Sequence, residues 1–150
     1  SRVVIADFFR SLTQTYNFFS LYANIDNYDV NKSELPIEDR PEIDKWILSR
    51  ANTIAKEYMK LMDEYELTKA HRLIQEFTIN ELSNWYIRRN RRRFWKGEND
   101  NDKLSAYQTL RKVFVRILQL TASAAPFLSE DLYQRLKKES EPIQFTLLIL

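Results

Sequence analysis

Glycine occurs once among the 150 residues, at Gly97, and proline only four times. Tight β-hairpins depend on glycine at positions of positive φ, so a chain with one glycine has almost no material for them. The glycine-rich loops that cradle phosphates need at least two glycines each, which excludes both G-x-G-x-x-G and G-x-x-x-x-G-K-[ST]. The sequence therefore predicts a mostly helical chain without a phosphate-binding loop.

Cysteine is absent and histidine occurs once, at His71. This composition excludes a disulfide framework, a thiolate zinc site, a cysteine nucleophile and the H-E-x-x-H motif. The triplet Asp100-Asn101-Asp102 resembles the start of a calcium loop but lacks the required glycine and closing glutamate, so it is interpreted as a solvated turn. We predict a structural role for His71, and neither catalytic residues nor a metal site.

No uncharged apolar run approaches the roughly 18 residues that a membrane span needs, and no signal peptide is visible. The absence of cysteine is typical of a reducing compartment. We therefore expect a cytoplasmic protein that does not enter a membrane.

Four long segments carry apolar residues at alternating steps of three and four, the pattern of amphipathic helices that pack on one another. Asp39 and Thr68 are predicted N-caps of the second and third helices, and Gly97 is the predicted stop of the third. The apolar stripe of the second helix includes Trp46 and Tyr65. After a bend at Pro126, residues 127–136 suggest a shorter helix. The four long segments are residues 5–23, 39–65, 68–96 and 104–121.

The predicted fold is thus all-α, a bundle of four long helices plus a shorter C-terminal helix. We assign residues 1–140 to this bundle. Residues 141–150 end in the β-prone apolar run Phe145–Leu150, which has no evident pairing partner in the chain. We interpret them as the start of a following segment that is truncated, and the chain as a piece of a longer protein that is expected to be a monomer.

Positive charge is concentrated in one short segment near the end of the third predicted helix. The whole chain has a formal net charge of +2. Six cations and no acid lie in this segment, so the remaining residues carry a formal charge of −4. The asymmetry indicates an anionic partner. The cations are Arg88, Arg89, Arg91, Arg92, Arg93 and Lys96.

On an ideal α-helical wheel, Trp85 continues the core-facing stripe of the third helix, and Arg88, Arg92 and Lys96 follow at the same azimuth. Unpaired buried charge costs several kcal/mol, which predicts that the helix extends past the edge of the bundle there. Arginine binds phosphates through two parallel hydrogen bonds, and Trp95 offers a face for base stacking. Unstacked loop bases can reach such a surface, so single-stranded loop RNA is the predicted partner.

A second interpretation of the basic segment stays open. Cations near a helix C-terminus also complement the helix dipole and can pair with acids on neighbouring helices. Trp85 and Tyr86 are predicted to lie in the core rather than at a contact surface.

The run Phe77-Thr-Ile-Asn-Glu-Leu-Ser-Asn-Trp-Tyr-Ile-Arg-Arg-Asn-Arg-Arg-Arg-Phe-Trp-Lys-Gly-Glu98 resembles the signature helix of isoleucyl-tRNA synthetases. Three other segments agree in order and spacing: residues 15–22, residues 39–50 and residues 125–130. The resemblance covers roughly residues 8 to 138. It is to the anticodon-binding domain of the eukaryote-like branch, which also occurs in some bacteria.

The resemblance implies a class I synthetase that activates isoleucine with ATP and esterifies it to its transfer RNA. The nucleotide-binding signatures and the editing domain are absent from this sequence, so the chain itself is expected to be non-catalytic and to bind no cofactor, ATP belonging to the parent enzyme. The implied partners are the anticodon stem-loop of tRNA(Ile) and the other domains of the synthetase. The residues to which RNA binding carries over are Arg88, Arg89, Arg91, Arg92, Arg93, Trp95 and Lys96, with Gln14 and Asn17 on the first helix.

Two alternatives remain. The chain could be a helical protein-interaction module whose basic helix docks an acidic partner. It could also be the equivalent domain of a valyl-, leucyl- or methionyl-tRNA synthetase, although those domains usually lack this density of arginine.

Overall fold

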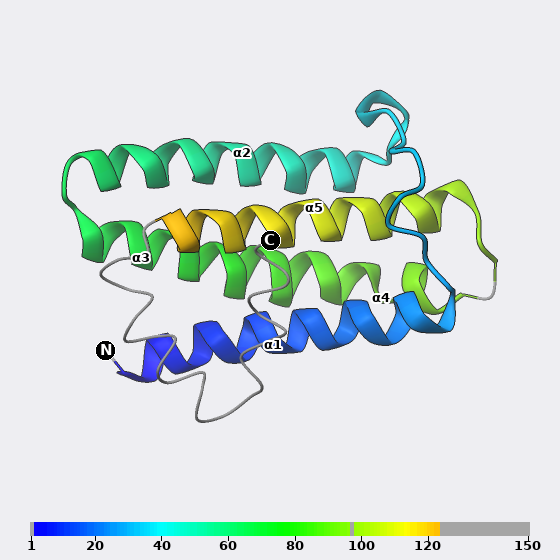
Figure 1. The fold of residues 1–150 in the computed structure, drawn as a ribbon, viewed down its shortest axis with the longest axis horizontal. Helices are drawn as coiled ribbons and strands as arrows, with labels where there is room; N and C mark the ends of the chain where they lie inside the picture. The colour runs from blue at the N-terminus through cyan, green and yellow to red at the C-terminus, as the bar shows by residue number, and fades with distance from the viewer. Residues whose placement is uncertain (1, 97, 124–150) are drawn as a thin grey trace.

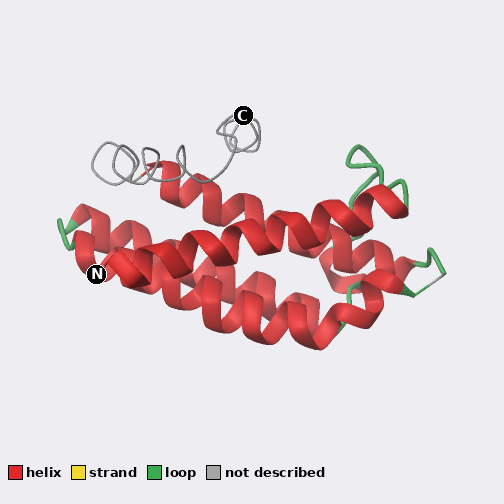
Figure 2. Cartoon of the chain, turned by 90° about the horizontal axis from the view of Figure 1, so that it is seen from below, coloured by secondary structure: helices red, strands yellow, loops and turns green. Residues whose placement is uncertain are grey.

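The computed structural model describes residues 2–96 and 98–123, and every regular element in this part is helical (Figure 2). The predicted all-α bundle of four long helices is confirmed. The shorter helix expected at residues 127–136, Gly97 and the segment 141–150 lie outside the described residues. The elements are α1 (Arg2–Ile25), the 3-10 turn η1 (Ile37–Asp39), α2 (Glu42–Asp63), α3 (Leu67–Glu76), the π-helix η2 (Phe77–Ile87), α4 (Arg88–Trp95) and α5 (Asn101–Ser123).

The elements α3, η2 and α4 form one continuous rod, because the backbone is helical at both joints, at Phe77 and at Arg88. The long third helix predicted from the sequence is therefore present, and we call it the α3–η2–α4 rod. Its neighbours are α1 on one flank and α2 on the other, and α5 completes the bundle (Figure 1). Successive long helices run in alternating directions, which brings the end of α1, the start of α2, α4 and the start of α5 to the same end of the molecule.

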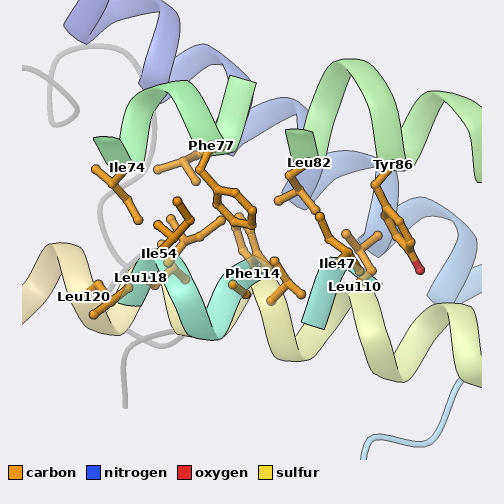
Figure 3. Packing of buried hydrophobic residues seen from close by; sticks show 14 of the residues in the cluster. Ile47, Ile54, Ile74, Phe77, Leu82, Tyr86, Leu110, Phe114, Leu118 and Leu120 are labelled. Atoms are coloured by element: carbon orange, nitrogen blue, oxygen red, sulfur yellow. The ribbon is translucent and has the colours of Figure 1, made fainter. Parts of the chain in front are cut away.

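The core is built from large apolar side chains of all four long helices. Figure 3 shows Leu82 and Tyr86 of the rod pointing toward Ile47 of α2 and Leu110 of α5. Phe77 points toward Ile54 of α2 and Phe114 of α5 in the same view. Side chains this deeply buried are close-packed, so the core fixes how each helix is rotated about its axis. The fully buried large residues are Phe8, Leu12, Ile47, Tyr58, Ile74, Phe77, Leu82, Tyr86, Phe94, Leu110, Ile117 and Leu118.

The helix starts differ from those predicted. Asp39 lies in η1, and α2 begins at Glu42 after Pro41, with no side-chain cap. Helix α3 begins at Leu67, one residue before Thr68, again without a side-chain cap. The predictions of Asp39 and Thr68 as N-caps are therefore wrong. At α2, proline is a favourable helix start in its own right and leaves one amide fewer to satisfy. At α3, the turn in which the Tyr65 and Glu66 amides bond back to α2 sets the start.

Two aromatic residues assigned to the apolar stripe of the second helix are not in the core. Trp46 is 37% exposed, and Tyr65 is 88% exposed in the turn that follows α2. Tyr65 has a φ of 59°, which is a left-handed turn geometry rather than a helical one.

The imidazole of His71 is buried in α3, and neither ring nitrogen has a hydrogen-bond partner among the described residues. Burial lowers the pKa of His71, because a charged ring would lose its hydration. A structural role for His71 stays a prediction, and its buried position in the bundle is compatible with that role. Among the described residues, no helix combines the length and apolar character that a bilayer span requires.

Acidification is expected to destabilise the bundle through His71. Above the unfolded-state pKa of about 6.5 the ring is neutral in both states; below it, the unfolded chain binds a proton that the folded chain resists, so stability is lost as the pH falls toward the lowered folded pKa. Urea unfolding between about pH 7 and pH 5 should show this decline in wild type and a flatter profile in His71→Leu. An unchanged slope in the variant would assign the decline to other groups.

Candidate nucleic-acid interface

The π-helix η2 decides which residues of α4 face the core. Its eleven residues bond i→i+5 instead of i→i+4, so each turn holds more residues than in an α-helix. The buried positions of the rod beyond Trp85 are consequently Tyr86, Ile87, Asn90 and Phe94. The wheel that placed Arg88, Arg92 and Lys96 on the core azimuth assumed α-helical geometry throughout.

The prediction that the helix extends past its packing partners is therefore wrong. Helix α4 stays packed up to its last turn, where the ring of Phe94 lies 5.0 Å from that of Phe18 in α1 and 5.1 Å from that of Tyr107 in α5. The arginines reach solvent because they lie on the outer side of a packed helix.

Arg93 points inward and is bound by a buried carboxylate. Its Nη1 and Nη2 donate to Oδ1 and Oδ2 of Asp44 at 2.7 and 2.8 Å. Asp44 is fully buried in the first turn of α2 and also accepts hydrogen bonds from Tyr86 (2.6 Å) and Ser105 (2.5 Å). Nη2 of Arg93 further contacts the Asp102 carboxylate at 3.0 Å. We call Asp44, Tyr86, Arg93, Asp102 and Ser105 the end network.

The end network shifts the ionisation of its members. Burial alone would raise the pKa of Asp44, but hydrogen bonds from Arg93, Ser105 and Tyr86 overcome it and hold the pKa below its ordinary value. Burial alone would lower the pKa of Arg93, and the Asp44 carboxylate raises it instead. Burial and the neighbouring Asp44 both raise the pKa of Tyr86. The ionised Asp44–Arg93 pair therefore ties the start of α2 to the end of α4.

Lys96 also forms ion pairs within the chain. Its Nζ lies 3.0 Å from a carboxylate oxygen of Asp100 and 3.0 Å from one of Asp102. Lys103, which is buried in α5, donates to the carbonyl oxygen of Lys96 at 2.7 Å and pairs with Asp26 at 2.8 Å. The second interpretation of the basic segment, pairing with nearby acids, thus applies to Arg93 and Lys96.

The other four cations face solvent. Arg88, Arg89, Arg91 and Arg92 are all exposed, and we call them the arginine face. Within residues 2–96 and 98–123, no ion pair involves any of these four guanidinium groups. Four unneutralised guanidinium groups within five residues form a concentrated positive surface, which attracts polyanions.

One flank of the arginine face borders a groove between α1 and the rod, with a volume of about 560 Å³. Gln14 lines it from α1, and Asn84, Arg88 and Arg91 line it from the rod. The structure thus brings the predicted residue Gln14 together with two predicted arginines. Asn17 is exposed on α1 but does not line this groove.

The other flank carries an aromatic contact that the sequence pattern missed. The rings of Trp46 in α2 and Trp85 in η2 lie 4.5 Å apart, and both side chains are 37% exposed. The guanidinium carbon of Arg89 lies 5.0 Å from the centre of the Trp85 ring. Trp85 was predicted to lie in the core; the π-helical register turns it to the surface and puts Tyr86 inside. Trp95, at 57% exposed, lies on the surface as predicted.

Sequence reasoning missed three features of this region. For Asp44 and Asn84 the spacing along the chain offered a signal, and for the Trp46–Trp85 contact it did not. Asp44 occupies the position three before Ile47 and four before Leu48, so it continues the buried stripe of α2, and a carboxylate there indicates a buried cationic partner. Asn84 precedes Arg88 by four residues and so shares its face of the rod. No pattern in the chain pairs Trp46 with Trp85. Among the described residues, no cluster of His, Asp and Glu is arranged to hold a metal ion.

Comparison with known proteins places this sequence in a family. The family described as "Anticodon-binding domain of tRNA ligase" matches residues 44–146. The isoleucine–tRNA ligase of Bacteroides fragilis is 51% identical over 129 residues, which cover 86% of this chain and 11% of that protein. The isoleucine–tRNA ligases of Dehalococcoides mccartyi and Thermus thermophilus are 46% and 40% identical, over 93% and 94% of this chain and 14% and 13% of those proteins.

The chain thus spans between a tenth and a seventh of the length of these curated relatives. The family match contains α2 from Asp44 onward, the whole rod and α5, and therefore both the end network and the arginine face. The helical bundle with one exposed arginine-rich helix belongs to the family of anticodon-binding domains of tRNA ligases.

Proposed function

We propose that this chain holds the anticodon stem-loop of tRNA(Ile) on the arginine face of α4 and in the adjoining groove with α1. The observation that carries the proposal is the set of four exposed, unneutralised guanidinium groups, Arg88, Arg89, Arg91 and Arg92, in a member of an anticodon-binding family. Arginine donates paired hydrogen bonds to phosphate oxygens, and such contacts fix the register of a nucleic acid on a protein.

The groove supplies groups of a second kind. The side-chain amides of Gln14 and Asn84 carry both donors and acceptors, which suit the edges of unpaired bases. Arg88 and Arg91 line the same groove and can hold the phosphates of those nucleotides. Trp95 and Asn17 remain proposed contacts at the margin. Arg93 and Lys96 support the surface through their intrachain ion pairs rather than by touching RNA.

The parent protein is proposed to be an isoleucine–tRNA ligase, which activates isoleucine with ATP and transfers it to its transfer RNA. This rests on the names of the similar proteins and on the signature run that begins at Phe77. The chain itself would bind no ATP and would act in the cytoplasm as part of a monomeric enzyme. Placement in the eukaryote-like branch stays a proposal from the arginine-dense motif, since the relatives named above are bacterial.

Neutralising three arginines is expected to remove most of the affinity for RNA. In Arg88→Gln/Arg91→Gln/Arg92→Gln, each lost charge-assisted contact is worth about 1.5–3 kcal/mol, so Kd for a synthetic isoleucine anticodon stem-loop should rise about a thousandfold or more. The slope of log Kd against log salt should fall by about 0.7–0.9 per arginine that contacts a phosphate. Fluorescence anisotropy across a salt series measures both quantities.

The matched control removes the same kind of charge elsewhere. Arg72→Gln/Arg116→Gln changes two exposed arginines on α3 and α5, and it should leave both Kd and the salt slope near their wild-type values. Wild-type affinity in the triple variant would reject the arginine face as the RNA site. Equal affinity for a stem-loop with a mismatched anticodon would show that the chain binds phosphates without recognising the anticodon bases.

A further inference from the structure

Trp46 and Trp85 come from different helices and meet at the surface, where their rings lie 4.5 Å apart at an interplanar angle of 57°. We call them the indole pair. Each ring is shielded on the side that faces the other and keeps part of its surface in contact with water. Exposed aromatic faces beside positive charge are the combination that single-stranded nucleic-acid sites use.

An ion pair joins the same two elements that carry the indole pair. Arg50 in α2 donates through Nε and Nη2 to the two carboxylate oxygens of Glu81 in η2, at 2.7 and 3.0 Å. Arg50 follows Trp46 by four residues, and Glu81 precedes Trp85 by four, so this bidentate bridge joins the same two elements beside the indole pair. The bridge is a second contact between α2 and η2, and its two charges neutralise each other, so Arg89 supplies the positive charge that lies on the indole pair.

Arg89 gives the surface its chemical preference. Its guanidinium lies over the Trp85 ring, an arrangement that holds the cation in place while its N–H groups stay available at the edges. Arg92 is exposed one turn further along α4. An apolar protein partner would have to remove these charges from water, whereas a nucleotide offers a flat ring for the indoles and a phosphate for Arg89.

We infer that the indole pair is a stacking site for one unpaired base of the RNA that the arginine face binds, with Arg89 on the adjoining phosphate. This inference rests on the proposed function and adds a base contact on the α2 flank of the rod, opposite the groove with α1. Base–aromatic stacking is worth about 1–3 kcal/mol per base and tolerates any base. The RNA loop therefore wraps over the exposed side of α4 and contacts both flanks.

The test removes the aromatic rings one at a time and compares the result with the effect of the arginine variant described above. Trp46→Ala and Trp85→Ala should each weaken binding of the isoleucine anticodon stem-loop about ten- to a hundredfold, with no change in the salt slope, because stacking releases no counterions. Trp46→Phe and Trp85→Phe should recover part of the affinity. The matched control is Tyr65→Ala, which removes an exposed ring in the α2–α3 turn at the far end of the bundle and should have no effect. A fully paired RNA duplex has no unstacked base, so its affinity should be the same for the wild-type chain and for each of these tryptophan and tyrosine variants.

A spectroscopic measurement reports the contact directly. In a Trp95→Phe background Trp46 and Trp85 are the only tryptophans of the chain, and under tryptophan-selective excitation the stem-loop should quench their fluorescence in proportion to binding. Circular dichroism establishes whether each variant is folded. If an alanine variant does not fold, the phenylalanine variant at the same position replaces it in the binding measurement.

The outcomes separate this inference from the function on which it rests. Arginine-dependent RNA binding with no change in the Trp46 and Trp85 variants and no quenching would overturn the stacking site and leave the proposed function standing. A salt slope altered in the tryptophan variants would also overturn it, since the rings would then act by positioning Arg89. No binding of the stem-loop by the wild-type chain would refute the proposed function itself.

Discussion

Replacing Asp44 with alanine is expected to lower the free energy of unfolding by about 3–5 kcal/mol, because removal of one partner from a buried ion pair leaves the other charge uncompensated. Asp44 is fully buried, and the side chain of Arg93 is only 14% exposed. The variant would also leave the hydroxyls of Tyr86 and Ser105 without their acceptor. Urea unfolding followed by circular dichroism measures the loss.

Two further variants make this prediction specific. Asp7→Ala breaks the exposed pair with Arg10 and should cost about 0–1 kcal/mol, as surface pairs do. Asp44→Leu combined with Arg93→Met removes both charges together and should recover much of the stability lost by Asp44→Ala, since apolar replacement of a buried pair is often nearly neutral. A loss below about 1 kcal/mol in Asp44→Ala would show that the end network does not hold α4 to α2.

Replacing Phe94 with alanine is expected to cost about 3–5 kcal/mol, the range for removal of a buried phenylalanine. Its ring is fully buried between Phe18 of α1 and Tyr107 of α5, so the variant leaves a cavity where three helices meet. Thermal unfolding measured by calorimetry reports the change. The neighbouring Trp95→Ala should alter stability by less than about 0.5 kcal/mol, because that ring is mostly in solvent.

The Phe94 and Trp95 variants also distinguish a residue that keeps α4 packed from a residue that contacts RNA. If α4 presents its arginines only while it is packed, Phe94→Ala should weaken stem-loop binding in proportion to the loss of the folded population, whereas Trp95→Ala would act on affinity alone. Similar stability losses in the two variants would contradict the π-helical register, which places residue 94 inside and residue 95 outside.

Part of this structure could be predicted from the sequence. The apolar periodicity and the near absence of glycine indicate an all-α bundle, and they locate the four long helices to within a few residues. The density of arginine after Ile87 identifies the segment that becomes the exposed basic helix. These features are local, since they depend on spacing along one helix and on residue type.

The helix starts were harder to predict than the helices. Asp39 and Thr68 are good capping residues, yet α2 and α3 begin elsewhere. Pro41 fixes the start of α2 through its own backbone, and a short turn at Tyr65 fixes the start of α3. Local capping preferences are worth about 1 kcal/mol, and packing of long helices overrides them.

The helical class of this protein and the position of its positive charge follow from residue type and spacing along the chain. The use of that charge depends on how the helices pack. The π-helix rotates α4, so Arg93 meets the buried Asp44 while Arg88, Arg89, Arg91 and Arg92 remain in water. Six cations of similar type are indistinguishable along the chain. Their roles differ because burial of a charge is stable only opposite a partner, and α2 brings that partner from 49 residues away.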